Sequence, residues 1–387
     1  MIHIKERIYK LFHHNQSEDR ILIKQSPNKS DMLFKDFFIN FLISLDGSTK
    51  SRTFYSTVAA GKHIVAGLGN YHMDEINKTV LREFINGFTK KQYTIGKGKN
   101  SRKEYYSQSE IHKIYQLLHS AIKEAADEDG DHLLRIDFMA NIKEPRSNRP
   151  MRPEPKALTD SEITLLLGFV SEVKMISVWV LVMLYTGVRP SEALALKFSD
   201  IDYNNKTVHI VRTLSEELYV DVKSLSSTKP QRPIITDLKN VRKGNRLNYQ
   251  KRTLKVGNVL LKVFKEWENY VKSNRRLMNM KRRNGTAEYL FCGSHGQFWL
   301  YDDYKQVYAR LLKKNGLNPS LYNPYRFRHN CCIRLLRMGV NLKATQMILG
   351  DNSPDMVMRV YANLDKSDVL EGSQNFSNSL DTILGIA

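Results

Sequence analysis

Apolar residues recur every three or four positions through residues 31–140, which is the spacing that places them on one face of an α-helix. The clearest such face covers residues 33–45 and contains four phenylalanines. Similar faces follow at residues 55–68, 80–88 and 111–122. Helices of this kind bury their apolar faces against one another, so the pattern predicts a compact four-helix bundle.

Local signals mark where helices begin and where they are interrupted. Ser107 stands three residues before Glu110, and Thr159 stands three residues before Glu162, which is the capping-box pattern of a helix start. Residues 90–103 contain glycines and several lysines without a helical period. They are therefore predicted to form a basic loop.

The apolar pattern changes after residue 158. Runs at residues 165–170 and 175–184 are apolar enough for buried helices, and shorter runs further on look like strands. Strands are expected at 207–213, 233–240 and 249–256, the last two joined by a basic turn around Gly244, and further helices at 259–271 and 304–312. The predicted fold is mainly α, with a helical bundle followed by a mostly helical domain that contains a small antiparallel sheet.

A proline-rich segment separates these two regions. Residues 143–156, KEPRSNRPMRPEPK, contain four prolines and no apolar period, which is typical of an extended linker. Its cations are suited to tracking phosphates, and a solvated spacer fits the same composition. The predicted organisation is a basic N-terminal arm (1–30), a helical domain (31–142), the linker (143–157), a second domain (158–367) and a C-terminal tail (368–387).

Charge and cysteine usage narrow the function. Sixty Lys and Arg residues stand against 40 Asp and Glu residues in the 387-residue chain, a formal charge of +20 that favours a polyanionic partner, above all nucleic acid. The three cysteines, Cys292, Cys331 and Cys332, contain no C-x-x-C pair, which argues against a zinc site or a disulfide framework. The sequence contains no apolar run of about 18 residues, so no membrane-spanning helix is predicted.

Three short segments carry candidate chemistry. Residues 186–196 place Arg189 between apolar helices, residues 323–349 contain Arg328 followed by His329, and Tyr361 lies ten residues after Asp351. Guanidinium groups grip an anion with forked hydrogen bonds, and a phenolic oxygen can act as a nucleophile beside it. Isolated arginines are more often surface charges, and Tyr361 is one of 19 tyrosines, but its position favours the nucleophile.

With these three segments in this order, the sequence resembles the tyrosine recombinase (phage integrase) family over nearly all of residues 31–365. The resemblance makes Arg189 and Arg328 the two arginines that bind the scissile phosphate, with Glu192 orienting Arg189. It makes Tyr361 the nucleophile and His329 the residue after the second arginine, although a structural role suits His329 equally. It also implies a core-binding (SAM-like) domain in the helical bundle and a catalytic domain after the linker.

The family also uses a lysine in a β-hairpin as the proton donor to the leaving oxygen. Lys239 is the preferred candidate, at the end of one predicted strand. Lys243, in the turn beside Gly244, is the alternative, and Lys229 is a third.

The sequence departs from the family at two positions. Tyr325 stands where the family usually has histidine, and Asp351 stands where it usually has histidine or tryptophan. Tyr325 can still donate one hydrogen bond to phosphate. An ionised Asp351 aimed at the phosphate would repel it, so three arrangements remain open: the carboxylate points away, pairs with an arginine, or is protonated.

The resemblance implies a site-specific recombinase, an integrase or transposase of a phage or another mobile element. Such enzymes cut and rejoin DNA through a 3′-phosphotyrosyl intermediate and a Holliday junction, and they need no metal or nucleotide cofactor. The implied partner is double-stranded DNA at specific sites. The implied assembly is a homotetramer on synapsed DNA and a monomer or weak oligomer when free, with the tail docking on a neighbouring protomer. Location at the nucleoid in the bacterial cytoplasm follows.

Two other functions remain open at this point. A type IB topoisomerase uses the same tyrosine chemistry but relaxes DNA instead of exchanging strands. A catalytically impaired, DNA-binding accessory recombinase is favoured only by the departures at Tyr325 and Asp351.

Overall fold

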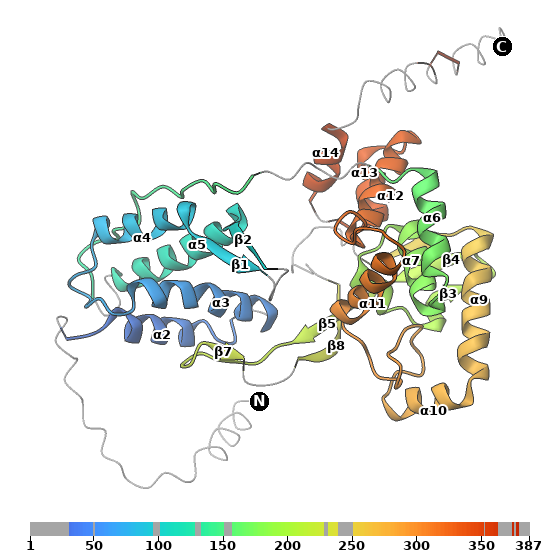
Figure 1. Cartoon of the computed structure of the whole chain (residues 1–387), viewed down its shortest axis with the longest axis horizontal. Coiled ribbons are helices and arrows are strands. Elements are labelled where there is room, and N and C mark those ends of the chain that lie inside the picture. The colour runs from blue at the N-terminus through green and yellow to red at the C-terminus, as the bar shows by residue number, and fades with distance from the viewer. Residues whose placement is uncertain are drawn as a thin grey trace, which may run out of the picture. The chain divides into compact units, whose positions relative to one another are not determined.

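The computed structural model describes residues 31–362, except 49–50, 96–100, 128–132, 151–156, 228–230, 239–250 and 352, together with Gln374, Ser377 and Asn378. The chain divides into two compact units (Figure 1). The first comprises Met1–Pro150 and Tyr219–Thr228, and the second comprises Met151–Leu218 and Lys229–Ala387.

The predicted helical bundle is present in the first unit. Its helices are α2 (Phe34–Ser44), α3 (Ser51–Leu68), α4 (Lys78–Lys90) and α5 (Gln108–Ala125). Their apolar faces meet in one core, where the side chains of Phe34, Phe38 and Ile64 are completely buried. The capping box predicted at the start of α5 forms, because the hydroxyl of Ser107 accepts from the backbone N–H of Glu110 while the Glu110 carboxylate accepts from the N–H of Ser107.

Two segments of the first unit differ from the sequence prediction. The basic segment at 90–103 is not all loop, because β1 (Gln92–Ile95) and β2 (Arg102–Tyr105) pair as an antiparallel hairpin. Residues 219–228, which the prediction gave to the second domain, belong to this unit. They form the short pair β6 (Val220–Asp221) and β7 (Ser226–Ser227), whose turn buries Val222 and Leu225 in the same core.

The second unit is built mostly of helices around a separate core. They are α6 (Asp160–Val170), α7 (Lys174–Thr186), α8 (Pro190–Leu194), α9 (Asn258–Ser273), α10 (Arg275–Arg283), α11 (Tyr301–Lys314), α12 (Tyr325–Arg337), α13 (Leu342–Leu349) and α14 (Asp355–Ala362). Trp179 of α7 is fully buried, and its ring centroid lies 5.5 Å from that of Tyr304 of α11. The mainly helical fold with small antiparallel sheets is confirmed.

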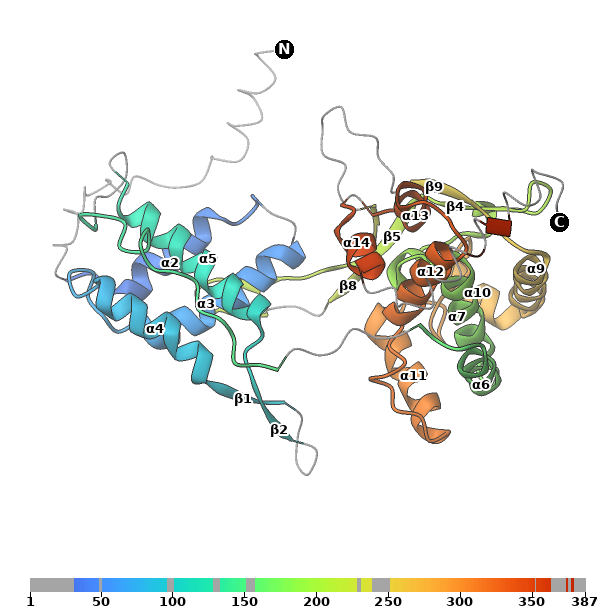
Figure 2. The same ribbon diagram turned by 90° about the horizontal axis from the view of Figure 1, so that it is seen from above.

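Each of the three predicted strand ranges of the second unit contains a strand, but two further strands lie wholly or mostly outside those ranges, and the pairing differs from the prediction. The β3 (Ile201–Asp202), β4 (Thr207–Ile210) and β9 (Arg252–Lys255) strands make one antiparallel sheet in the order β3-β4-β9, and β5 (Arg212–Glu217) pairs with β8 (Arg232–Asp237). The prediction joined the last two strands as a hairpin, which is wrong: β8 pairs with β5, and β9 pairs with β4. Within this unit α13 lies against β9, and α14 lies against α12 (Figure 2).

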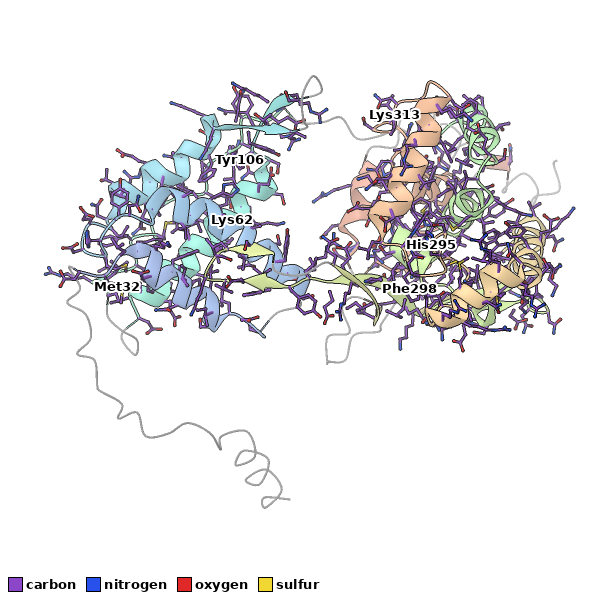
Figure 3. All side chains as sticks on the ribbon, turned by 60° about the horizontal axis from the view of Figure 1, so that its bottom comes forward. Met32, Lys62, Tyr106, His295, Phe298 and Lys313 are labelled. Atoms are coloured by element: carbon purple, nitrogen blue, oxygen red, sulfur yellow. The ribbon has the colours of Figure 1, made fainter. Side chains whose placement is uncertain are left out.

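Basic side chains project from both units. Lys62 on α3 and Lys313 on α11 are exposed, as Figure 3 shows. Within the described part of the chain, every helix is too short or too polar to cross a membrane.

Candidate active site

Arg189 is positioned by the turn between α7 and α8. Gly187 ends α7 in the left-handed conformation at φ 61°, and Pro190 begins α8, which keeps Arg189 extended between them. A Cβ on Gly187 would lie 2.7 Å from both Cys331 Sγ and Leu349 Cδ2. Glycine is therefore needed at position 187 for two reasons: it can adopt this backbone conformation, and it leaves room for side chains of α12 and α13 to pack against the turn.

Arg328 comes from the first turn of α12 and is buried. Its Nη1 donates to the carbonyl oxygens of Gly187 at 2.9 Å and Leu349 at 2.7 Å. These are the carbonyls left unpaired where α7 and α13 end. One guanidinium group thus joins the ends of two helices and is held in a fixed orientation.

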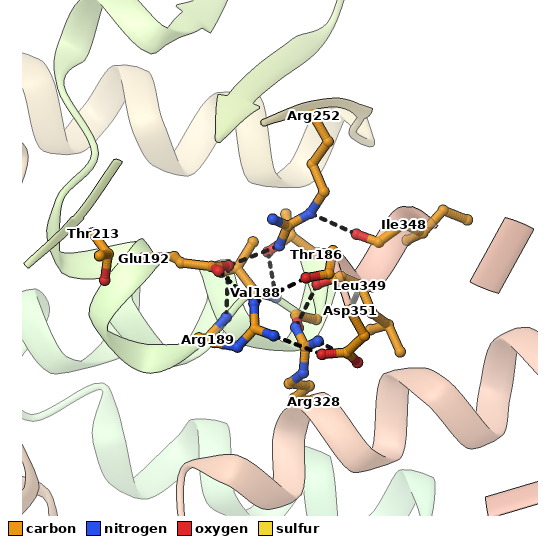
Figure 4. Close-up of polar contacts among 12 residues, drawn as sticks. Thr186, Val188, Arg189, Glu192, Thr213, Arg252, Arg328, Ile348, Leu349 and Asp351 are labelled. Carbon is orange, nitrogen blue, oxygen red and sulfur yellow. Dashed lines mark hydrogen bonds and ion pairs between the residues drawn. The ribbon is translucent and has the colours of Figure 1, made fainter. Parts of the chain in front are cut away.

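Asp351 is aimed at both arginines by the turn that ends α13. Gly350 adopts φ 70°, and the N–H groups of Gly350 and Asp351 both donate to the carbonyl oxygen of Gln346, a left-handed helix cap. The carboxylate of Asp351 lies 2.6 Å from Arg189 Nη2 and 2.6 Å from Arg328 Nη2 (Figure 4). Of the three arrangements left open by the sequence, pairing with arginine is the one observed.

The two contacts of Asp351 are not equivalent. Arg189 Nη2 donates a well-formed hydrogen bond to Oδ1. Arg328 Nη2 and Asp351 Oδ2 are equally close, yet among the described residues neither atom has an aligned hydrogen-bond partner. The contact between Arg328 and Asp351 is therefore an ion pair without an aligned hydrogen bond.

A third arginine, Arg252, completes the cluster and was not among the predicted site residues. Its Nη2 lies 2.8 Å from Glu192 Oε2, while Arg189 Nη1 lies 2.7 Å from Glu192 Oε1 (Figure 4). The sequence held one signal for it: Arg252 falls on the same side of its predicted strand as Leu254 and Val256, which are buried. A charge on the buried face of a strand needs a partner.

The charges of the cluster control its pKa values. Burial alone would raise the pKa of Glu192, but Arg252 and Arg189 outweigh burial and hold that pKa below its ordinary value. Burial, followed by repulsion from Arg189, lowers the pKa of Arg328, and Asp351 offsets part of the shift. Burial opposes the charge of Arg189, yet Glu192 and then Asp351 raise its pKa.

The cluster as a whole favours an anion. Three guanidinium groups face two carboxylates, which leaves a net charge of +1 in a largely buried site. A phosphate group placed beside Arg189 and Arg328 would meet forked donors of the kind that recognise it. Asp351 already occupies part of that position, so the same geometry also provides a competing anion.

The remaining predicted site residues differ in how exposed they are to solvent, and three of them are not described. Tyr325 begins α12, one turn before Arg328, and half of its surface is exposed. His329 is half-buried on the same helix. Lys239, its alternative Lys243 and Lys229 lie outside the described residues.

Tyr361 lies in the last turn of α14. Its side chain is outside the described part of the structure, but the helix that carries it is anchored. Val357 and Val360 are buried in a cluster with Cys331 and Leu349. The backbone at Tyr361 is therefore held against α12 and α13, the helices that supply Arg328 and lead into Asp351.

Comparison with known proteins gives consistent results. A model of the phage integrase family matches residues 156–368. The transposase from transposon Tn916 of Enterococcus faecalis is 26% identical over 216 residues, covering 53% of this chain and 47% of that protein. A tyrosine recombinase XerC-like protein of Caldanaerobacter subterraneus is 23% identical over 184 residues, covering 46% and 43%. The chain spans about half the length of these curated relatives.

Solved structures share the fold. The Tn1549 transposon integrase in complex with transposon right end DNA superimposes with a TM-score of 0.61 at 18% identity, covering 89% of this chain and 100% of that chain. A lambda integrase dimer bound to a COC′ core site gives a TM-score of 0.54 at 15% identity, covering 92% and 84%. At these identities the likeness establishes the fold of the chain and no more.

Proposed function

The chain belongs to the phage integrase family, and on that basis we propose that it is a site-specific DNA recombinase, an integrase or transposase of a mobile element. It cuts and rejoins duplex DNA through a 3′-phosphotyrosyl intermediate on Tyr361 and exchanges strands through a Holliday junction. The observation that carries the proposal is the pair of guanidinium groups, Arg189 and Arg328, both brought to within 2.6 Å of one carboxylate.

The proposed chemistry follows from what the scissile phosphate requires. The phenolic oxygen of Tyr361 bonds to phosphorus and loses its proton, while the 5′ oxygen leaves and gains one. The five-coordinate transition state carries more negative charge than the starting ester, and Arg189 and Arg328 can neutralise it. Removing one such preorganised donor costs roughly a hundredfold to a thousandfold in rate.

The other site residues have supporting roles in this proposal. Lys239, or alternatively Lys243, donates the proton to the leaving oxygen. Tyr325 donates a hydrogen bond to the phosphate from the exposed end of α12, and His329 supports Arg328 on the same helix. Because the phosphotyrosyl ester conserves the energy of the broken bond, the proposed reaction needs no nucleotide. Because Arg189 and Arg328 neutralise the charge of the transition state, the reaction needs no metal.

The proposed partner is double-stranded DNA at specific sites. A formal charge of +20 supports it, since cations that neutralise phosphates release condensed counterions. We assign DNA gripping to residues 31–142, a linker to 143–157 and catalysis to 158–367, within which residues 219–228 fold with the first unit. The working assembly is a homotetramer on synapsed DNA, in which residues 368–387 dock on a neighbouring protomer. Bacterial or phage origin places the reaction at the nucleoid.

A suicide-substrate experiment tests the proposal. Duplexes from the DNA flanking the gene are nicked so that the leaving strand diffuses away, and covalent protein is resolved on a denaturing gel. We expect an adduct with the wild-type chain and none with Tyr361→Phe, which keeps the aromatic ring but lacks the nucleophilic oxygen. Failure of the wild-type chain to form an adduct on any flanking duplex would contradict the proposal.

One alternative retains specific support. Asp351 against both arginines favours an accessory recombinase that binds DNA without cutting it. Binding of flanking DNA without adduct formation would identify that function. Strand exchange between two labelled duplexes separates recombination from topoisomerase activity, which would relax a supercoiled plasmid without exchanging strands.

A further inference from the structure

Arg252 lies at the first residue of β9, opposite Ile210 of β4. Its side chain is only 6% exposed, so its charge is stable there only with partners that replace water. Two of these partners lie on different elements of the second unit. One is the carboxylate of Glu192 on α8, and the other is the carbonyl oxygen of Ile348 in the last turn of α13.

The first partner connects Arg252 to Arg189. Glu192 accepts from Arg189 Nη1 through Oε1 at 2.7 Å. Its other oxygen, Oε2, accepts from Arg252 Nη2 at 2.8 Å and from the backbone N–H of Arg189 at 3.1 Å. Arg252 adds a charged donor to the same oxygen that accepts from this backbone N–H, so it holds the carboxylate more firmly in the orientation that binds Arg189. Arg252 therefore helps to hold the guanidinium of Arg189 through the carboxylate that the two arginines share.

The second partner connects Arg252 to the turn that carries Asp351. Arg252 Nε donates to Ile348 O at 2.7 Å, and the guanidinium packs on Gly350 so closely that an added Cβ would lie 2.4 Å from Nη1. That turn leads into Asp351 and then into α14, which bears Tyr361. One side chain thus joins the segment of Arg189, the strand β9 and the segment of Tyr361.

We propose that Arg252 is a positioning residue for the reaction. It acts on Arg189 through Glu192, and on the Asp351 turn through the end of α13. This inference rests on the proposed function, because it concerns the geometry of the same site. This role needs the planar guanidinium group of arginine. Lysine has the same charge but cannot direct one N–H to Ile348 and another to Glu192 with the same geometry.

The test compares Arg252→Gln, Arg252→Lys and the control Lys255→Gln in the full-length chain. Lys255 lies on the same strand and is exposed, so its replacement removes one positive charge without touching the cluster. The readouts are the single-turnover rate of adduct formation against pH, DNA affinity and Tm. A displacement of Arg189 by about 1 Å should lower the rate of Arg252→Gln by roughly tenfold to a hundredfold, with DNA affinity retained.

The pH profile separates positioning from a structural role. The charge of Arg252 lowers the pKa of Glu192 from a distance of 2.8 Å, so removing it raises that pKa. In Arg252→Gln, Glu192 should therefore become protonated at a higher pH than in the wild type, and protonated Glu192 releases Arg189. The acidic limb of the rate profile then moves to higher pH. Arg252→Lys, which keeps the charge, should restore the position of that limb but only part of the rate.

A readout independent of activity keeps the two proposals distinguishable. In arginine-labelled protein, the Arg189 Nε–H resonance, assigned through Arg189→Lys, should exchange faster with solvent in Arg252→Gln and remain unchanged in Lys255→Gln. If the wild-type chain forms no adduct, the proposed function fails and this resonance still decides the role of Arg252. An unchanged Arg189 resonance, or a rate loss that tracks losses of Tm and DNA affinity with an unmoved pH profile, would overturn the inference.

Discussion

Replacing Asp351 with asparagine tests whether its carboxylate competes with phosphate for the two arginines. Asparagine has nearly the same shape but no charge. In the DNA-free protein Asp351 lies 2.6 Å from both guanidinium groups, and its side chain is only 14% exposed. A phosphate can use both guanidinium groups only if this carboxylate moves aside or shares them.

The size of the effect follows from the charges. A phosphate gripped by the same two arginines would lie about 5 Å from the carboxylate, where two unit charges repel by roughly 3 kcal/mol at an effective dielectric constant of about 20. That corresponds to about two powers of ten in affinity. In the opposite direction, Arg328 loses the carboxylate paired with it, and breaking a buried ion pair costs up to about 3–5 kcal/mol of stability. We expect the lower end, because Gly187 and Leu349 still accept from Arg328.

The assay is thermal unfolding of the full-length chain in increasing inorganic phosphate. Asp351→Asn should unfold at lower temperature than wild type without phosphate, and phosphate should raise its Tm at lower concentrations than it does for wild type. Asp355→Asn is the control, because Asp355 is an exposed acid at the start of α14 and its replacement changes the net charge equally. Equal phosphate dependence in Asp351→Asn and wild type would refute the reasoning. It would show instead that the carboxylate serves only to hold the arginines.

Two further predictions concern the helices around the site. Gly187→Ala should lower the free energy of unfolding in urea by about 2–4 kcal/mol. The added Cβ would lie 2.7 Å from Cys331 and Leu349, and the φ of 61° is unfavourable for alanine. A loss below about 0.5 kcal/mol would contradict this packing. Burial raises the pKa of Cys331 to about 11 and that of Cys332 to about 12. Both thiols should therefore resist iodoacetamide at pH 8 in the folded chain and react once it is unfolded, whereas rapid native labelling would show that α12 is not buried as described.

The sequence alone was sufficient where structure depends on near neighbours. The apolar faces at residues 33–45 and 111–122 became α2 and α5, because helical packing is governed by side chains three and four positions apart. The capping boxes at Ser107 and Thr159 formed for the same reason: their hydrogen bonds join residues three positions apart. The family was also accessible, since the order of short segments is itself a property of the sequence.

Strand pairing was decided by the tertiary structure. The last two predicted strands are close in sequence, and a hairpin between them was the local solution. Instead, β8 pairs with β5, and β9 returns to β4, where Arg252 lies opposite Ile210. Residues 219–228 likewise joined the core of the first unit through Val222 and Leu225, although the sequence around them belongs to the second.

The detailed geometry of the candidate site was also decided by distant contacts. The sequence indicated Arg189, Arg328 and Asp351 as site residues, but it left open whether the Asp351 carboxylate points away, pairs with an arginine or is protonated. The contact observed joins Arg189 to Asp351 across 162 positions, and that between Arg252 and Glu192 crosses 60. A buried charge takes whichever partner the folded backbone brings within reach, and no local pattern of polar and apolar residues encodes that choice.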